Sequence, residues 1–346
     1  MPEVSSFPGI EAAFRRSERR LWGLCYRLTG VAADADEVVQ EAFARALEQK
    51  PALDGEDLER WLVRVATNLG LDRLRRRKRR VYPGSWLPSP VEQDEAQDAL
   101  HGAPHGVPVE ESAAARYERA EEASYAWLVA LETLGPRARA ALVLADVLDY
   151  PAADVARFLD TSEGNVRVLH HRARRALDAL DVEAVVSGDA RSRQQEALAK
   201  FVACMVQQDA AGMEALLAEG VRSITDGGGR YTALREPLSG RDRVARFHLE
   251  TGRRRTPIST TEIRIVNGSP ALVVATRPLR AQMAPRLVLR VELDRAGLIR
   301  AIYTVLAPSK LTAVQFPAAP AGRGAEDDGN AEGLFATDHG VEEKPV

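Results

Sequence analysis

The chain has 346 residues and a mass of 37.8 kDa, which exceeds the size at which one hydrophobic core stops growing, so two or more domains are expected. Hydrophobic residues make up 45% and charged residues 28%, the balance of a globular protein. The longest apolar runs span a few residues, whereas a membrane helix needs roughly twenty, and the first residues show no export signal. The sequence therefore predicts a cytoplasmic protein without membrane contact.

The cysteines indicate neither a disulfide framework nor a metal site. Cys25 and Cys204 are the two cysteines of the chain, and both lie in apolar helical patterns. We expect buried structural thiols, no bound metal and no cofactor.

Charge is segregated along the chain, although the net charge is only −3. Arg73 and the run from Arg75 to Arg80 are basic, residues 92–122 are mostly acidic, residues 191–310 carry a net of about nine positive charges, and residues 326–343 are acidic. Such blocks favour a polyanionic partner and allow one part of the chain to attract another.

Residues 7–84 have the period of helices. The apolar residues of a first helix recur every three or four positions, at Ile10, Phe14, Leu21, Cys25 and Leu28. Thr29-Gly30 should end this helix. A second helix is expected to open at Asp34, with Glu37 completing a capping box. A third follows a loop over residues 51–57 and buries Leu58, Trp61, Leu62, Val65 and Leu69.

The opposite face of the third helix is polar and basic. Arg60, Arg64, Asn68 and Arg75 are spaced so that they project to one side. Arginine suits phosphates and asparagine suits a base edge, so this face can follow a nucleic-acid strand. For any single residue, a solvated surface helix is the simpler interpretation, but the dense basic run after it favours nucleic acid.

Residues 85–122 lose this period and are predicted to form a linker. It begins with Trp86-Leu-Pro-Ser-Pro90. A free linker is a poor place for an aromatic ring, so Trp86 is expected to dock on a domain surface.

Residues 123–186 carry a helix–turn–helix pattern. A helix over Arg137–Leu148 precedes a short helix that opens at Pro151. Ala152, Val155, Ala156 and Leu159 form the packing face of that short helix. Asp160-Thr161-Ser162 forms the turn, with Ser162 as the N-cap of a helix over Glu163–Leu177. That helix presents a surface suited to a major groove, made of Asn165, Arg167, His171, Arg172, Arg174 and Arg175. A hairpin that serves packing alone is the alternative.

Residues 190–312 change from helical to alternating patterns. Helices are expected over residues 194–207 and 210–218, and strands over residues 221–224, 258–266, 271–276, 286–293 and 298–306. Asp226-Gly227-Gly228-Gly229 should form a turn. The order predicts an α+β domain, a cone with a curved antiparallel sheet, after two all-α domains. Residues 313–346 are expected to be a disordered tail.

The first half resembles the extracytoplasmic-function (ECF) sigma factors of bacterial RNA polymerase. The resemblance lies in Asp34-Ala-Asp36-Glu37-Val-Val-Gln40-Glu41-Ala-Phe43, in residues 61–72 with the basic run, and in residues 131–137 and 161–174. It covers about the first 185 residues. His170 and Asp160 depart from the common Leu and Gly, and His170 bears on how tightly the last helix seats.

This resemblance implies partners and contact residues. Asp36, Glu37, Gln40 and Glu41 would bind the clamp helices of the largest polymerase subunit, and the polymerase flap would be a second contact. Arg60, Arg64, Asn68, Arg75, Arg76 and Arg79 would contact the minus-10 element of promoter DNA. Ser162, Asn165, Arg167, His171, Arg172 and Arg174 would contact the minus-35 element. A pocket in the loop over residues 51–58 would hold an unstacked base.

The C-terminal part resembles the SnoaL-like domains fused to one subgroup of these sigma factors. The signals are Trp86-Leu-Pro-Ser-Pro90, Asp226-Gly-Gly-Gly229 and Ala307-Pro-Ser-Lys310-Leu311. Ser89, Ala307 and Ser309 depart from the usual Trp-Leu-Pro-Glu-Pro and Asn-Pro-Asp-Lys-Leu. The resemblance implies that interdomain regulation involves Trp86, Pro88, Asp226, Gly227, Gly228, Gly229 and Lys310. Arg253, Arg254 and Arg255 could assist closure by attracting the acidic linker.

These observations predict a sigma factor that directs promoter-specific initiation, is controlled by its C-terminal domain and catalyses no reaction. One alternative is a helix–turn–helix regulator that acts alone and senses a small molecule in the cone. The clamp-binding motif argues against it. Another is a cone enzyme that uses Asp209, Asp226 or His248 as acid or base. Six large side chains of the cone are expected in its core rather than in a ligand cage: Phe201, Met205, Phe247, Leu272, Leu289 and Tyr303.

Overall fold

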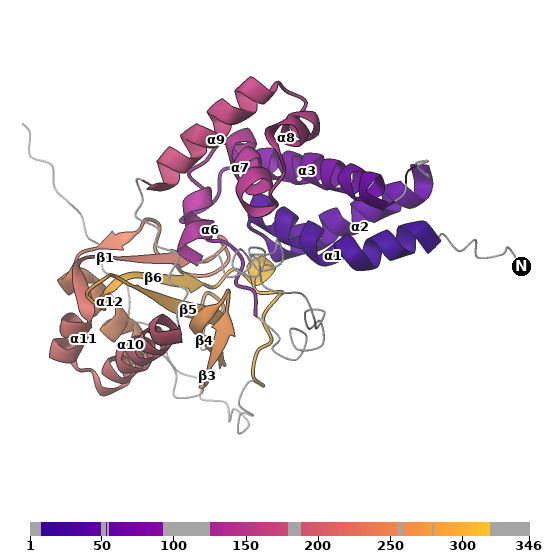
Figure 1. The fold of residues 1–346 in the computed structure, drawn as a ribbon. Coiled ribbons are helices and arrows are strands. Elements are labelled where there is room, and N and C mark those ends of the chain that lie inside the picture. The colour runs from indigo at the N-terminus through magenta and orange to yellow at the C-terminus, as the bar shows by residue number, and fades with distance from the viewer. Residues whose placement is uncertain are drawn as a thin grey trace, which may run out of the picture.

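The computed structural model shows helices gathered on one side and a sheet with its own helices on the other (Figure 1). It describes residues 8–49, 53, 55–92, 125–178, 188–254, 259–278 and 280–318. The predicted fold class is confirmed: two helical units precede an α+β domain. The described helices include none that is long and apolar enough to cross a membrane.

The N-terminal helical domain consists of α1 (Pro8–Thr29), α2 (Ala32–Gln49) and α3 (Gly55–Arg79), which pack on one another. As predicted, α1 ends at Thr29-Gly30, where Gly30 has a φ of 71°. The expected capping box at Asp34 is wrong, because the Val31 carbonyl already accepts from the Ala35 amide at 3.1 Å and α2 starts at Ala32. Residues 55–57, expected in a loop, already belong to α3.

The helix–turn–helix domain consists of α6 (Tyr125–Leu131), α7 (Pro136–Leu142), the π-helical turn η1 (Val143–Val147), α8 (Ala152–Leu159) and α9 (Glu163–Asp178). The helix expected over residues 137–148 ends in that wider turn, where the Leu148 amide donates to the Val143 carbonyl at 3.2 Å. The turn is confirmed. Asp160 has a φ of 49°, and the Ser162 hydroxyl accepts from the Asn165 amide at 3.2 Å.

The C-terminal domain has a six-stranded sheet in the order β2-β1-β6-β5-β4-β3. The strands are β1 (Leu217–Asp226), β2 (Leu238–Ser239), β3 (Ser259–Val266), β4 (Ser269–Thr276), β5 (Arg286–Leu293) and β6 (Ile299–Val305). The sheet is mixed rather than wholly antiparallel, because β1 and β6 run parallel. After β1 the chain forms the edge strand β2 beside it and then crosses through a helix to the opposite edge, from which the four strands β3 to β6 return until β6 lies beside β1.

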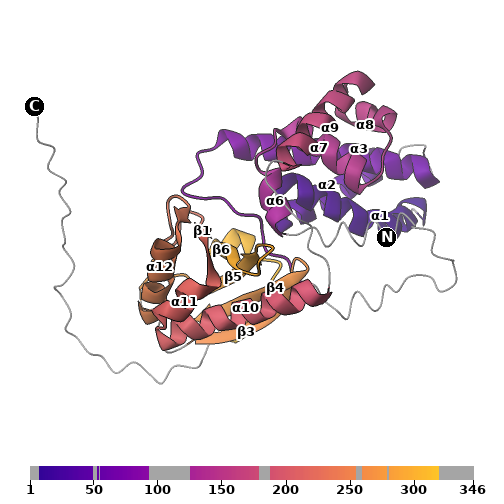
Figure 2. The same ribbon diagram turned by 60° about the vertical axis from the view of Figure 1, so that its left-hand side comes forward.

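The helices α10 (Gly188–Gln207), α11 (Ala210–Leu216) and α12 (Arg241–Arg254) cover one face of this sheet (Figure 2). The helix α12 was not predicted, because its few apolar side chains stand among many charged ones. Of the six large side chains expected in the cone core, Phe201, Met205, Leu272, Leu289 and Tyr303 are buried and Phe247 is half-buried. Cys25 and Cys204 are buried free thiols, as predicted.

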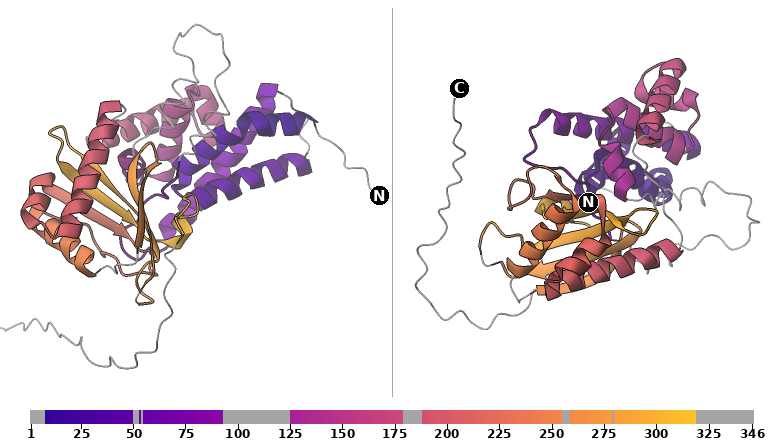
Figure 3. Two further views of the ribbon diagram at one scale, coloured as in Figure 1. Left: turned by 90° about the horizontal axis from the view of Figure 1, so that it is seen from below. Right: turned by 90° about the vertical axis from the view of Figure 1, so that its left-hand side faces the viewer.

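The other face of the sheet packs against the two helical domains (Figure 3). Successive side chains of β4 point to opposite faces of the sheet. Leu272 and Val274 face the helices of their own domain, whereas Val273 belongs to the apolar cluster shared with α1–α9. Docking of the C-terminal domain therefore buries apolar surface of a sheet that already has one covered face.

The segments expected as linker and tail are ordered where the structure describes them. Residues 85–92 run between the domains, with Leu87 to Pro90 buried, and Glu92 forms a bridge to Val266. Residues 313–318 are not a free tail, because the Ala313 carbonyl accepts from the Glu92 amide at 2.9 Å. The rest of both segments, residues 93–124 and 319–346, lies outside the described residues.

Candidate polymerase, promoter and interdomain sites

The proposed polymerase-binding residues lie on the exposed side of α2. Asp36, Glu37 and Gln40 are exposed and Glu41 is half-buried. Arg73 of α3 lies against this acidic row, 2.6 Å from a Glu37 carboxylate oxygen and 3.7 Å from one of Glu41. The Trp22 indole donates to the Asp36 carboxylate at 2.6 Å. Neighbouring helices thus orient these carboxylates.

The predicted DNA-binding face of α3 is open. Arg60, Arg64, Asn68, Arg76 and Arg79 are exposed, and Arg75 is half-buried. Their partners lie one turn away: Arg60 pairs with Glu56 at 3.2 Å, and Arg75 with Asp72 at 3.0 Å. Exposed pairs of this kind are weak, so phosphates could displace them. The proposed base pocket depends on residues 51, 52 and 54, which lie outside the described residues.

Two members of the basic run, the half-buried Arg77 and the exposed Lys78, bond to the helix–turn–helix domain instead. Arg77 donates to the Thr29 carbonyl and to the Glu132 carboxylate. The Lys78 ammonium donates to the Leu134 carbonyl at 2.6 Å and to the Glu132 carbonyl at 3.1 Å. Burial lowers the pKa of Lys78. The last turn of α3 is therefore divided between a solvent-facing side and a side that holds the helix–turn–helix domain.

The proposed minus-35 residues form one exposed surface on α9. Ser162, Asn165, Arg167, His171, Arg172 and Arg174 are all exposed. His170 lies with Nε2 at 2.6 Å from the Asp146 carboxylate of η1. Arg174 pairs with the same carboxylate at 2.8 Å. This polar contact, rather than an apolar one, seats the helix.

Asp226 forms the centre of the contact between the C-terminal domain and the segment after α3. It is 0% exposed, and it accepts from the Tyr82 hydroxyl at 2.6 Å and from the Leu87 amide at 2.8 Å. It also accepts from the Lys310 ammonium, which is itself 3% exposed. Burial lowers the pKa of Lys310 to about 8, against the attraction of Asp226. A residue expected chiefly to open a turn thus also joins residues 82–87 to Lys310.

The glycines after Asp226 permit close approach of other segments. The Gly228 amide donates to the Asp226 carboxylate at 3.0 Å, and Gly228 and Gly229 have positive φ. A Cβ atom at Gly229 would come within 2.5 Å of Pro83, and one at Gly228 within 2.8 Å of Ala307. Only glycine fits both the backbone angles and the space.

A second set of charges links α3 to the helix–turn–helix domain. Glu132 pairs with both Arg77 and Arg139. Arg139 is 0% exposed, and its Nε donates to the Arg27 carbonyl at 2.6 Å. Burial raises the pKa of Glu132, but the two arginines outweigh burial and lower the pKa below its ordinary value. Glu132 and Arg139 were not singled out from the sequence. The sequence signal that could have found Arg139 is a single arginine among alanines on the apolar face of its helix.

Trp86 connects the two sets, since the Arg77 guanidinium lies 3.8 Å and the Lys310 ammonium 3.9 Å from the centroid of its ring. The predicted docking of Trp86 is confirmed. We call this group the three-domain junction; its members are Arg77, Trp86, Glu132, Arg139, Asp226 and Lys310.

Further contacts extend the interface on both sides of the junction. The Tyr125 hydroxyl of α6 donates to the Pro88 carbonyl at 2.8 Å. The Tyr26 hydroxyl of α1 donates to the Ser89 carbonyl at 2.5 Å and accepts from the Asn267 amide group at 3.0 Å. The Tyr26–Asn267 contact could not be predicted from a local pattern, because 241 positions separate the two residues.

The acid and base candidates of the cone lie apart and have structural roles. The Asp209 carboxylate caps α11, accepting from the Gly212 amide at 2.9 Å. Asp226 belongs to the junction. His248 is buried beside Phe201, with Nε2 at 3.0 Å from the Ser223 hydroxyl. Arg253 lies with Nε at 3.3 Å from the Gln208 side chain, and the acidic linker expected to face it lies outside the described residues.

Comparison with known families identifies both helical domains. Residues 13–80 match sigma-70 region 2, and residues 125–177 match sigma-70 region 4. These two regions, on the helical domains that carry the exposed basic faces, define a sigma factor.

Similarity over the full length narrows the family. The ECF RNA polymerase sigma factor SigJ of Mycobacterium tuberculosis (strain ATCC 25618 / H37Rv) is 34% identical over 334 residues, which cover 93% of this chain and 98% of that protein. SigG of M. tuberculosis (strain CDC 1551 / Oshkosh) is 33% identical over 200 residues, 55% of this chain and 54% of that protein. The crystal structure of M. tuberculosis SigJ matches with a TM-score of 0.67 and 28% identity, over 89% of this chain and 100% of that one. The chain belongs to the ECF RNA polymerase sigma factors, with a C-terminal SnoaL-like domain.

Proposed function

We propose that this sigma factor binds polymerase and promoter through the three exposed faces of α2, α3 and α9, and that its C-terminal domain controls it by holding these faces in a packed, inactive arrangement. As an ECF sigma factor, the chain directs promoter-specific initiation by RNA polymerase. The proposal assigns the acidic face of α2 to the clamp helices of the core enzyme. It assigns the basic face of α3 to the minus-10 element and the surface of α9 to the minus-35 element.

The packing of α7 and α8 on α3 is the observation that supports the proposed inactive arrangement. The two promoter elements are named for positions that lie about 25 base pairs apart, which is roughly 85 Å of duplex at 3.4 Å per base pair. The 25-residue helix α3 is only about 38 Å long at 1.5 Å per residue. Because that length is less than half of the separation of the two elements, we infer that the packed helical domains separate for initiation.

The three-domain junction supports a locking role for the C-terminal domain. Lys310 and Asp226 join that domain to residues 82–87, and Trp86 joins this segment to the α3 end that holds the helix–turn–helix domain. Breaking a buried ion pair by removing one partner costs roughly 3–5 kcal/mol. A change of that size at Asp226 would shift the balance between packed and separated states by two orders of magnitude or more.

Transcription by core polymerase with the full chain tests this proposal. Asp226→Asn keeps the shape of the side chain and removes its charge, so it should release the packed state and raise transcription from a promoter found in a genomic library. Arg286→Gln, an exposed change on β5, is the matched control. Unchanged activity of Asp226→Asn would contradict the proposed control by the C-terminal domain. Failure of the unaltered chain to support transcription from any promoter would contradict the assignment of the three faces.

We further infer that the chain acts in the cytoplasm, beside polymerase, and catalyses no reaction. Asp209, Asp226 and His248 each have a structural partner and do not converge on one cavity. Turnover of a small substrate that is lost on changing His248 would contradict this.

A further inference from the structure

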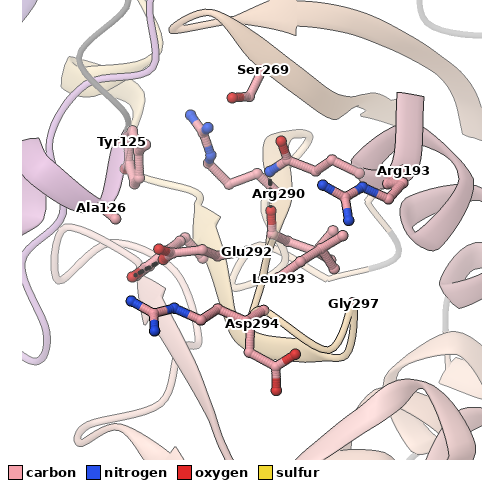
Figure 4. Close-up of a pocket in the computed structure, with 13 residues that line it drawn as sticks. Tyr125, Ala126, Arg193, Ser269, Arg290, Glu292, Leu293, Asp294 and Gly297 are labelled. Carbon is pink, nitrogen blue, oxygen red and sulfur yellow. Dashed lines mark hydrogen bonds between the residues drawn. The ribbon is translucent and has the colours of Figure 1, made fainter. Parts of the chain in front are cut away.

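A cavity lies where the C-terminal domain meets α6, apart from the surfaces assigned above. Its volume is about 310 Å³, at the lower end of small-molecule sites. Tyr125 and Ala126 of α6 form one wall, the hairpin of β5 and β6 forms another, and Arg193 of α10 closes a third side (Figure 4). The cavity is therefore built from two domains.

Arg290 places a buried positive charge in this cavity. The residue is 4% exposed, and its guanidinium lies between Tyr125 and Ser269 (Figure 4). Its Nη1 donates to the Val266 carbonyl at 3.3 Å, and its guanidinium carbon lies 4.5 Å from the centroid of the Tyr125 ring. Among the residues the structure describes, no carboxylate forms an ion pair with it. A guanidinium has five N–H donors, so most of this capacity is left for a ligand.

The carboxylates of the lining are engaged elsewhere. Glu292 accepts from the Tyr303 hydroxyl at 3.0 Å and pairs with Arg300. Asp294 accepts from the Leu298 amide at 2.9 Å within the hairpin turn. With Arg193, Arg290 and Arg295, the lining has three positive charges against two negative ones. Burial of Arg290 without a carboxylate is unfavourable, and burial lowers its pKa.

We propose that this cavity binds a small organic anion, a carboxylate on a compact apolar or aromatic body. The planar fork of a guanidinium matches the two oxygens of a carboxylate, so the carboxylate would lie on Arg290. The rings of Tyr125 and Tyr303 and the side chain of Leu293 offer an apolar wall for the body. Phosphate shares the anionic oxygens but lacks the apolar body.

Such a ligand would favour the packed state, an inference that rests on the proposed function. Tyr125 belongs to the helix–turn–helix domain and Arg290 to the C-terminal domain, so the complete site exists only while the two are docked. A ligand that binds one state alone shifts the equilibrium towards it. At a free concentration ten times its Kd, the ratio of docked to undocked chains rises about elevenfold.

Isothermal titration calorimetry of the full chain tests the site, with sodium benzoate, inorganic phosphate and benzyl alcohol as probes. Benzoate should bind, and benzyl alcohol should bind at least about tenfold more weakly because it lacks the charge. Arg290→Gln should abolish benzoate binding, and Arg286→Gln on the same strand should leave it unchanged. Ser269→Phe should also abolish it by filling the cavity while Arg290 stays. Melting temperatures without probe identify variants that fail to fold.

Several outcomes would overturn the proposal. These are absence of benzoate binding, equal affinity for benzyl alcohol, unchanged binding by a folded Arg290→Gln or Ser269→Phe variant, or binding of phosphate alone. Transcription with core polymerase distinguishes ligand binding in the cavity from the effect of that binding on activity. Benzoate at ten times its Kd should lower transcription by up to about elevenfold in the unaltered chain but not in Arg290→Gln. Binding without that effect would overturn the regulatory step alone, whereas inactivity without any probe would overturn the proposed function.

Discussion

The two basic helices, α3 and α9, use their charges differently. On α9 the proposed DNA contacts all face solvent; Arg167 pairs with Glu163 one turn away, and Arg174 pairs with Asp146 of its own domain. On α3 the basic run divides, since Arg76 faces solvent while Arg77 and Lys78 hold Glu132 and its neighbours. Domain packing therefore occupies part of the basic run of α3 and leaves the basic surface of α9 open. Under the proposed function, α3 would thus couple promoter binding to the arrangement of the domains.

The largest expected effect concerns the inward side of α3. Glu132→Gln leaves Arg77 and the fully buried Arg139 without their common counter-charge. The free energy of unfolding, measured with urea, should fall by roughly 3–5 kcal/mol. Glu163→Gln removes a similar but exposed pair on α9 and should change the stability by less than about 0.5 kcal/mol. Equal losses in the two variants would abolish the distinction between the helices.

The same carboxylate predicts a pH dependence. The pKa of Glu132 in the folded chain lies below the ordinary 4.5, because Arg139 and Arg77 outweigh the opposing effect of burial. A lowered folded-state pKa contributes stability that is present above pH 4.5 and is lost as the pH falls through 4.5 towards the folded value. The stability difference between the unaltered chain and Glu132→Gln should therefore shrink below pH 4.5. A difference that persists in strong acid would show that the charge of Glu132 is not its source.

A smaller effect is expected at the start of α9. Ser162→Ala removes the hydroxyl that caps the Asn165 amide and should cost about 1 kcal/mol of unfolding free energy. Ser162→Asp keeps an acceptor there and should retain the stability. Loss of stability in both variants would indicate that Ser162 acts otherwise than as a cap.

The smallest effect separates two neighbouring arginines. Arg76→Gln should weaken binding of the polymerase complex to every promoter DNA, with the slope of log affinity against log salt reduced by about 0.9. Arg77→Gln should leave that slope unchanged, because Arg77 also donates to the Thr29 carbonyl of its own domain, a contact that does not depend on the packing of the two helical domains. Fluorescence anisotropy over a salt series measures both, and equal slopes would place both residues on DNA.

Much of the fold follows from local patterns. The apolar period of α1, the turn at Asp160 and the cap at Ser162 depend on residues within a few positions, and all were predicted. The helix α12 was missed because charged residues obscure its period, and the parallel pairing of β1 with β6 joins strands far apart in sequence. The Tyr26–Asn267 contact was missed because it depends on domain packing.

The sequence by itself determined the family, the helix–turn–helix pattern and the solvent-facing basic surfaces, because helical period fixes which residues share a face. Only the tertiary structure decided which charged residues are buried. Arg139, Asp226, Arg290 and Lys310 are charged residues in a sequence rich in them, and their burial depends on which domain covers them. Desolvation makes a buried charge depend on its partners, and those partners come from other domains.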